Sequence, residues 1–332
     1  MIGITYHKDF NKYDLGLKHP LVGDKPKNTM ELLKEKGLIK KLEVFTPKNA
    51  KEDDLLKVHT KEYIDKLKKL SKTGGFISAD TPTPIGIFKT ASLATGATIL
   101  CGEKLFENFK IMINPLGGFH HSAISSTSGF CFFNDIAILI EKLRKKQKLK
   151  RFLIIDLDVH HGNGTQEIYC RDPTVLNLSF HQDGRTLYPG NGAIDFIGKE
   201  SGEGYTINLP LPPGTGSKAY LYSFDEIIPK IVKQFNPEFI IYQSGVDTHH
   251  QDPLADLSLS YQTFYYLAKK IKKIANENCD KLAVLLGGGY NSKDSVKSNY
   301  NIICGLLDYK YYFREFDSYN FKKYEIVKNQ VS

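Results

Sequence analysis

The sequence predicts a three-layer α/β/α fold, in which a central, mainly parallel β-sheet lies between two layers of helices. Short, continuous apolar runs rich in Ile, Val, Leu and Phe recur along the 332 residues, and longer stretches with helical spacing separate them. Continuous apolar runs are typical of strands buried on both faces of a parallel sheet, and parallel strands need crossover helices. No repeat, linker or break in composition divides the chain, so we expect one domain over residues 1–332.

Five apolar runs are the predicted strands. They lie at residues 110–114, 152–155, 175–180, 239–242 and 282–286. Helices are expected at 54–70 and 89–106, where apolar side chains recur at helical spacing. The basic run Lys142–Arg151 is predicted to end a further helix, because positive charge complements the dipole at a helix C-terminus.

Composition and charge are those of an ordinary globular protein. Hydrophobic residues make up 41% of the chain and the net charge is +8, a mild excess that does not call for a nucleic-acid partner. The five cysteines never approach Cys-x-x-Cys spacing, which argues against a disulfide framework and a thiolate zinc site. No apolar run approaches the length of a membrane span and no signal-peptide pattern begins the chain, so we expect a cytoplasmic protein without membrane contact.

Polar clusters directly follow four of the predicted strands. The segments are GGFHH, DLDVHHGNG, QSGVDTHHQDP and GGGYN. Ligands of parallel sheets bind where the carboxyl ends of the strands open into loops, so we expect these segments to converge at one sheet edge. Three histidine doublets lie in them, at His120–His121, His160–His161 and His249–His250, although the chain has only ten histidines. Chance explains this poorly, and the doublets indicate chemistry at that edge.

The segment DLDVHHGNG offers candidate metal ligands. Asp156, Asp158 and His160 recur at every second residue after a strand, which projects them to one side. Taken alone, the two acidic residues could instead cap the following helix. Asp247, after another strand, is the natural further ligand, since catalytic zinc usually takes three protein ligands and leaves one position open. An Asp-His-Asp set also accepts Fe(II), so these residues do not fix the metal.

Seven motifs in order make the chain resemble the superfamily of histone deacetylases, acetoin-utilisation proteins and acetylpolyamine amidohydrolases, in its class II-like form. The motifs are GGFHHS, GFCFFND, DLDVHHGNGTQ, LSFH, LYPG, GVDTHHQDPLADL and GGGYN. The likeness runs from the first loop, near Pro26, to Gly289–Tyr290. It implies an arginase/deacetylase-like fold and the metal-dependent hydrolysis of N-acetyl amides, chiefly of acetyl-lysine, with release of acetate.

The resemblance also implies roles for the reacting groups. It assigns Asp158, His160 and Asp247 to the catalytic zinc (or iron), which would polarise the amide carbonyl and lower the pKa of water. It assigns His120 and His121 to proton transfer and electrostatic stabilisation, with His121 as the general base that later protonates the leaving amine.

Further positions follow from the same resemblance. Asp156 matches the residue that orients His120 and that helps to bind a monovalent cation, potassium, together with Ser179 and Phe180. Tyr290 matches the hydroxyl that faces the developing oxyanion. Without the other motifs, the three glycines before it would be an ordinary turn.

Five positions match the substrate channel of the family. They are Asp80 at the rim, Gly129 with a backbone carbonyl for the substrate amide, Phe130 and Tyr188 as aromatic walls, and Gly288 beside Tyr290. Taken alone, either aromatic ring could be plain core.

Two positions depart from branches of the family. Asn163 stands where one branch has an aspartate as partner of the second histidine, so His121 is expected to be less basic than there. Relatives of the other branch carry asparagine at this position. Leu254 stands where polyamine-selective relatives have a glutamate, which counts against a carboxylate gatekeeper for cationic small substrates.

Three questions stay open at this point. An arginase-like hydrolase with two metal ions would need further carboxylates where His161 and Thr248 stand. A silent acyl-lysine reader is the other alternative, against which the presence of Tyr290 argues. The partners could be acetylated lysine side chains of proteins or acetylated small amines, and in an oligomer the loop from Lys18 to Asn28 could meet a partner subunit at the entrance.

Overall fold

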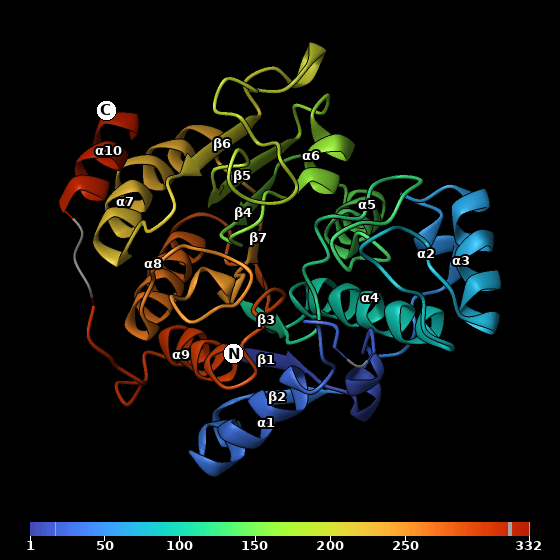
Figure 1. Ribbon diagram of the computed structural model, residues 1–332. Helices are drawn as coiled ribbons and strands as arrows, with labels where there is room; N and C mark the ends of the chain where they lie inside the picture. The colour runs from blue at the N-terminus through green and yellow to red at the C-terminus, as the bar shows by residue number, and fades with distance from the viewer. Residues whose placement is uncertain (17, 318–320, 332) are drawn as a thin grey trace.

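A single eight-stranded sheet, parallel throughout, organises the computed structural model, which describes residues 1–16, 18–317 and 321–331 (Figure 1). The strand order is β2-β1-β3-β8-β7-β4-β5-β6. The strands are β1 (Ile2–Thr5), β2 (Glu43–Phe45), β3 (Ile111–Asn114), β4 (Phe152–Asp156), β5 (Val175–Gln182), β6 (Thr206–Leu211), β7 (Phe239–Gln243) and β8 (Leu282–Leu285).

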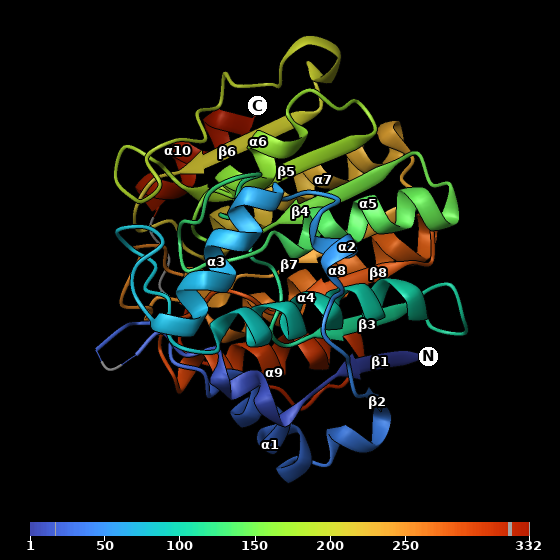
Figure 2. The same cartoon turned by 90° about the vertical axis from the view of Figure 1, so that its right-hand side faces the viewer.

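Helices cover both faces of the sheet, as the sequence predicts (Figures 1 and 2). One face carries α1 (Lys25–Glu35), α7 (Ser217–Phe235), α8 (Tyr261–Asn278) and α9 (Asp294–Leu306). The other carries α4 (Ile87–Lys104), α5 (Asp135–Gln147) and α6 (Asn163–Tyr169). Outside these layers lie α2 (Glu52–Leu55) and α3 (Lys61–Thr73), and α10 (Phe321–Val331) packs against α7. The three-layer α/β/α prediction is therefore confirmed.

All five predicted strands are present, and three others were missed. The missed strands β1, β2 and β6 are short or lie at the ends of the sheet, where burial is one-sided. In β2 the side chains of Glu43 and Val44 are exposed, so no apolar run marks it. In β6 the side chains of Ile207 and Pro210 are only partly buried, and Pro210 is tolerated because the strand is at an edge.

The helix predictions are confirmed at 89–106, where α4 forms, and are partly wrong at 54–70. There the chain forms α2, leaves the helical path, and begins α3 after Thr60, whose hydroxyl accepts the N–H of Tyr63 at 3.2 Å. This side-chain cap satisfies an N–H group at the new helix start. The basic run does end a helix, since α5 stops at Lys148, whose φ is 58°.

The carboxyl ends of four neighbouring strands lie level. Asn114 of β3 is in register with Leu285 of β8, Leu285 with Gln243 of β7, and Gln243 with Asp156 of β4. The loops that follow these strands therefore start side by side, although the chain segments are far apart in the sequence. All five cysteines are free, and none of the helices in the described ranges is long and apolar enough to span a bilayer.

Candidate active site

The three predicted ligands meet where β4 and β7 end. Asp158 and His160 follow β4, and Asp247 lies in the short 3-10 turn η4 (Val246–Thr248) after β7. Nδ1 of His160 is 3.2 Å from an oxygen of Asp158 and 3.2 Å from an oxygen of Asp247. All three side chains are buried, and their ligand atoms lie within 4.8 Å of one another.

Backbone N–H groups hold these carboxylates in place. Asp247 accepts the N–H of Val159 at 3.0 Å, and Asp158 accepts the N–H of His160 at 2.9 Å. Each of the two carboxylates thus faces His160 and also accepts a backbone hydrogen bond from the loop after β4, which stabilises the conformation of that loop. These bonds hold Asp158 and His160 in place beyond the end of β4 at Asp156, where hydrogen bonds between strands no longer fix the backbone.

The donor set fits a divalent cation. Burial alone would lower the pKa of His160, but Asp158 and Asp247 outweigh it and raise that pKa to about 10. Two buried carboxylates around one imidazole therefore demand a positive charge. One nitrogen and two carboxylate oxygens suit zinc, and also Fe(II).

The histidine pair lies beside the ligands, in the loop after β3. Nδ1 of His120 is 2.6 Å from Asp156 and Nδ1 of His121 is 2.6 Å from Oδ1 of Asn163, while the two Nε2 atoms are 3.1 Å apart. Burial acts to lower the pKa of His120, but the charges of Asp156 and Asp158 raise it to about 9. Burial and the charge of His120 lower the pKa of His121 well below its ordinary value. The pKa values of the two adjacent imidazoles are thereby shifted in opposite directions.

Tyr290 reaches the site from the loop after β8. Its ring lies 6.3 Å from that of His160 and 5.7 Å from that of Phe130, between centroids. Burial and the carboxylates of Asp247 and Asp158 raise the pKa of Tyr290 well above its ordinary value, so the hydroxyl keeps its proton. It is available as a hydrogen-bond donor.

Position 288 needs a glycine, because the loop after β8 passes too close to the proposed ligands to leave room for a side chain. Its φ is +74°, and a Cβ there would come well inside 3.0 Å of Asp158 Oδ2 and to 3.0 Å from Asp247 Oδ2. Gly288 therefore lies against the ligand carboxylates.

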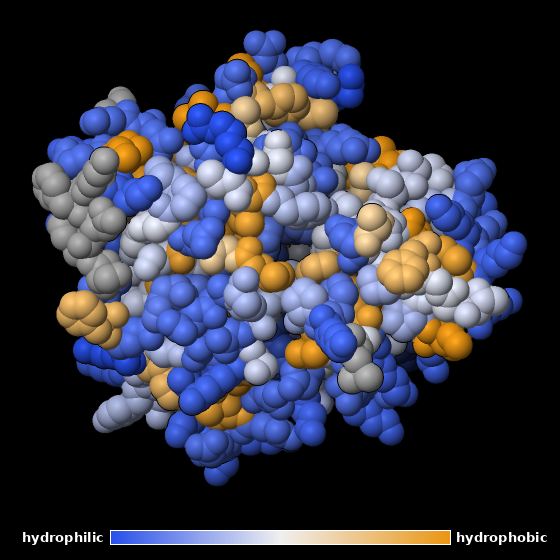
Figure 3. Space-filling view, viewed as in Figure 1, coloured by the Kyte–Doolittle hydropathy of each residue, from blue (hydrophilic) through white to orange (hydrophobic). Residues whose placement is uncertain are grey.

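A narrow hollow opens near the centre of the face onto which the strand ends point (Figure 3). The ring of Tyr188, which is 41% exposed, lies 5.2 Å from His121 and 6.2 Å from His160. Phe130, with φ 68°, contacts Tyr290 from another loop. Tyr188 therefore borders the proposed ligand His160, and Phe130 borders Tyr290, whose ring lies next to His160.

The remaining rim residues are tied to one another. Asp80 accepts the N–H of Gly129 at 2.7 Å, and Thr81 accepts the N–H of Phe130 at 3.1 Å. The Gly129 carbonyl accepts the thiol of Cys131 at 3.2 Å and keeps one lone pair for a further donor. Asp80 thus supports the backbone that shapes the channel.

The proposed potassium ligands are also adjacent. Asp156 and Ser179 are paired in the β4–β5 register, and both are buried, as is Phe180. The Ser179 hydroxyl lies 2.8 Å from Nδ1 of His181. Potassium binding here stays a prediction.

Comparisons with known proteins agree with this geometry. The model of the histone deacetylase domain family matches residues 19–306. The chain belongs to this family. A probable deacetylase of Archaeoglobus fulgidus is 38% identical over 92% of this chain and 86% of its own length. A histone deacetylase-like amidohydrolase of Pseudomonas aeruginosa is 35% identical over 83% and 72%, and the acetoin utilization protein AcuC of Staphylococcus xylosus is 33% identical over 87% and 78%.

The fold comparison gives the same family. The crystal structure of the HDA15 HD domain has a TM-score of 0.87 and 26% identity, and the match covers 99% of this chain and 94% of that one. The arginase/deacetylase-like fold is thereby confirmed. Family membership supports an enzyme of the deacetylase and amidohydrolase class, which acts on amides.

Two residues of this histone deacetylase domain were missed by the sequence reasoning. Lys25, at the start of α1, donates from Nζ to the Gly288 carbonyl beside a cavity of about 60 Å³. Burial lowers the pKa of its ammonium group to about 8, against the opposing charges of Asp247 and Asp158. Asp252 accepts the backbone N–H of Tyr290 at 2.7 Å. Lys25 carries no sequence signal of such a contact, and Asp252 stands in the polar cluster after the strand at 239–242 without a pattern that points to Tyr290.

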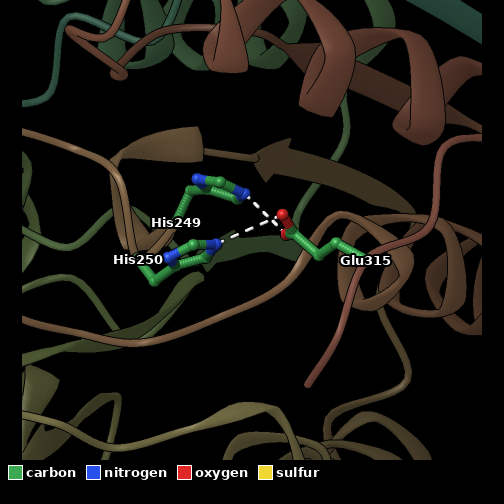
Figure 4. A group of neighbouring side chains, drawn as sticks. All are labelled: His249, His250 and Glu315. Atoms are coloured by element: carbon green, nitrogen blue, oxygen red, sulfur yellow. Dashed lines mark hydrogen bonds and ion pairs between the residues drawn. The ribbon is translucent and has the colours of Figure 1, made fainter. Parts of the chain in front are cut away.

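One expectation about the histidine doublets is wrong. His120, His121 and His160 meet at the site, but His249 and His250 do not, because both rings face Glu315 instead (Figure 4). His161 also points elsewhere, between Asn191 and Gln166. A loop can start at the right strand end and still turn some of its side chains away from the site.

Proposed function

We propose that this chain is a zinc-dependent deacylase that hydrolyses N-acetyl amides, most readily acetyl-lysine, and releases acetate. The observation that carries the proposal is the contact of a buried Asp158–His160–Asp247 set with two histidines of opposite pKa. Titratable groups whose pKa values are pushed apart mark the acid and the base of an active site.

In this proposal the residues Asp158, His160 and Asp247 hold one ion. When bound, zinc or Fe(II) supplies Lewis-acid chemistry, which polarises an amide carbonyl and acidifies water. The backbone bonds to both carboxylates fix these ligands before the ion arrives, so little reorganisation is needed.

His121 is the proposed general base. Its Nδ1–H donates to the neutral amide oxygen of Asn163, so the lone pair that would accept a proton from the attacking water is on Nε2, which lies 3.1 Å from Nε2 of His120. The water oxygen bonds to the acyl carbon, the C–N bond breaks, and the proton passes from His121 to the amine nitrogen. Acetate and a free amine result.

His120, Tyr290 and Asp156 stabilise charge during this reaction. The raised pKa of His120 keeps it protonated against Asp156 at neutral pH, so it adds a positive charge next to His121. The Tyr290 hydroxyl donates to the oxygen that becomes negative, a type of contact that contributes about two to three orders of magnitude in rate.

The aromatic channel favours a lysine-like stem. Phe130 and Tyr188 present ring surface to the methylene groups, and Asp80 supports Gly129, whose carbonyl could accept the substrate amide. Acetylated polyamines and small metabolite amides are the second substrate class. We place the protein in the cytoplasm, in keeping with its free cysteines, and assign a structural potassium ion to Asp156, Ser179 and Phe180.

A panel assay tests the proposal. Zinc-reconstituted protein is given acyl-lysine peptides and acetylated polyamines, and release of free amine is measured, with Tyr290→Phe as the control. Turnover of peptides that the substitution strongly slows supports a lysine deacylase, whereas turnover of polyamines alone gives the second class. Tight peptide binding without any hydrolysis identifies an acyl-lysine reader, and two tightly bound ions per chain contradict the single-ion site.

A further inference from the structure

The chain continues beyond the matched deacetylase domain in an extended segment, residues 309–317, which we name the C-terminal strap. Two side-chain amides hold its backbone. Asn301 of α9 exchanges two hydrogen bonds with Phe313, both 2.8 Å. Gln262 of α8 does the same with Glu315, at 3.0 and 3.2 Å. The backbone of the strap is therefore held at two positions, Phe313 and Glu315. At each position a side-chain amide makes the pair of hydrogen bonds that a neighbouring strand would make.

The strap delivers the Glu315 carboxylate to three donors. One oxygen accepts the Nε2–H of His249 and the backbone N–H of Tyr261, both at 2.8 Å, and the other lies 3.2 Å from Nε2 of His250 (Figure 4). Tyr261 begins α8, where Ser260 makes no side-chain cap, so Glu315 takes over that role. The carboxylate thereby joins a helix start to the turn that carries His249.

This turn contains two parts of the active site. Asp247 stands two residues before His249, and Asp252 three residues after it. The His249 backbone N–H donates to Val246 at 3.2 Å and its carbonyl accepts the N–H of Asp252 at 2.9 Å. Asp252 in turn holds the backbone of Tyr290. A displacement of His249 would therefore reach both a proposed metal ligand and the proposed oxyanion donor.

The geometry of the cluster is that of hydrogen bonds rather than of a second metal site. The Nε2 atoms of the two imidazoles face different oxygens of the Glu315 carboxylate, and the rings lie 4.5 Å apart at 37°. The Gln251 backbone N–H donates to Nδ1 of His249 at 3.2 Å. Nδ1 is then the acceptor of a neutral ring and Nε2 carries the proton, which leaves no lone pair there for a metal.

We propose that Glu315 is a positioning residue, which acts through His249 to hold the turn of residues 246–252, and with it Asp247 and Tyr290, in place for the reaction. The inference rests on the proposed function for its catalytic consequence, but its effect on metal binding can be measured without turnover. The strap is thus a functional part of the enzyme, although it lies outside the family domain match.

The test compares variants of the full-length protein in zinc affinity, by chelator competition, and in kcat and KM on an acyl-lysine peptide. Glu315→Ala should raise the zinc dissociation constant and lower kcat, each by about tenfold, the lower end of outer-contact effects in metal sites. KM should stay within about twofold, because the aromatic walls Phe130 and Tyr188 come from loops other than the turn of residues 246–252. Glu315→Gln should restore both values, since its amide oxygen still accepts from His249 and Tyr261.

Asp317→Ala is the matched control, because Asp317 anchors the same strap to Ser217 at 2.7 Å without touching His249. It should leave zinc affinity and kcat unchanged. If Glu315→Ala does not fold, Glu315→Asp, which keeps the charge and shortens its reach, should still weaken zinc binding several-fold.

Two results overturn the proposal. One is wild-type zinc affinity and kcat in a folded Glu315→Ala or Glu315→Asp protein. The other is zinc binding by Asp158→Ala that Glu315→Ala abolishes, which would make the cluster a metal site. If the wild-type protein hydrolyses no substrate, the proposed function fails, while the zinc measurement still decides the role of Glu315.

Discussion

Replacing Gly288 by alanine should weaken metal binding more than it weakens the fold. The new Cβ would fall inside 3.0 Å of Asp158 Oδ2, whereas ordinary contacts begin at 3.4 Å, so the ligand carboxylate must move. The shift is on the order of 1 Å, and disturbing how a metal ligand is held costs up to about 100-fold in metal affinity. We expect the zinc dissociation constant to rise by about that factor, equivalent to about 2.7 kcal/mol.

Gly37→Ala is the control that separates backbone strain from the clash. Gly37 has φ +71°, close to the +74° of Gly288, but nothing lies within 4 Å of its Cβ position. Each substitution should lower the free energy of unfolding by about 1–2 kcal/mol, because alanine is strained in the left-handed conformation. Denaturant titration of the metal-free protein measures this loss. Only Gly288→Ala should lose zinc affinity in chelator competition. Equal zinc affinities in the two variants would refute the placement of Gly288 against the ligands.

Other perturbations address the proton-transfer groups and the ion. Tyr290→Phe should lower kcat by about two to three orders of magnitude with zinc binding unchanged, and an unimpaired kcat would remove Tyr290 from the mechanism. Asn163→Asp puts a negative charge 2.6 Å from Nδ1 of His121, which raises the lowered pKa of this base. Since the base must be neutral, the acidic limb of the kcat/KM profile should move to higher pH, and a shift to lower pH would contradict the assignment. Chelation should abolish activity and lower Tm, and zinc at about 1,000 times its dissociation constant should restore about 4 kcal/mol of unfolding free energy.

The sequence predicts the sheet interior better than its edges. Runs such as 152–155 and 282–286 are buried on both faces, so nothing interrupts their apolar character and the pattern is clear. In β2 no side chain is fully buried, and in β6 polar residues and a proline interrupt the apolar side chains, which removes that signal. The break between α2 and α3 was hidden because the cap at Thr60 is a local contact that helical spacing does not report.

The site was predictable where sequence-local motifs carry it and not where distant segments complete it. Asp158 and His160 come from one loop, and the family motifs supply Asp247 and Tyr290. Lys25 and Glu315 arrive from opposite ends of the chain, and each is a common charged residue with no motif around it. The doublet His249–His250 was misplaced because sequence position gives the strand end that a loop leaves, but not the direction in which its side chains turn.

The level strand ends described above also determine when this centre can form. β8 is the last strand in the chain, yet it lies between β3 and β7, so without it the sheet consists of two separate halves. The histidine pair belongs to one half and the three ligands to the other. Contacts between residues so far apart in the chain are slow to form in folding. The complete centre therefore assembles only after residues 282–290 have been synthesised, whereas the three proposed metal ligands already lie together in the half that contains β7 and β4.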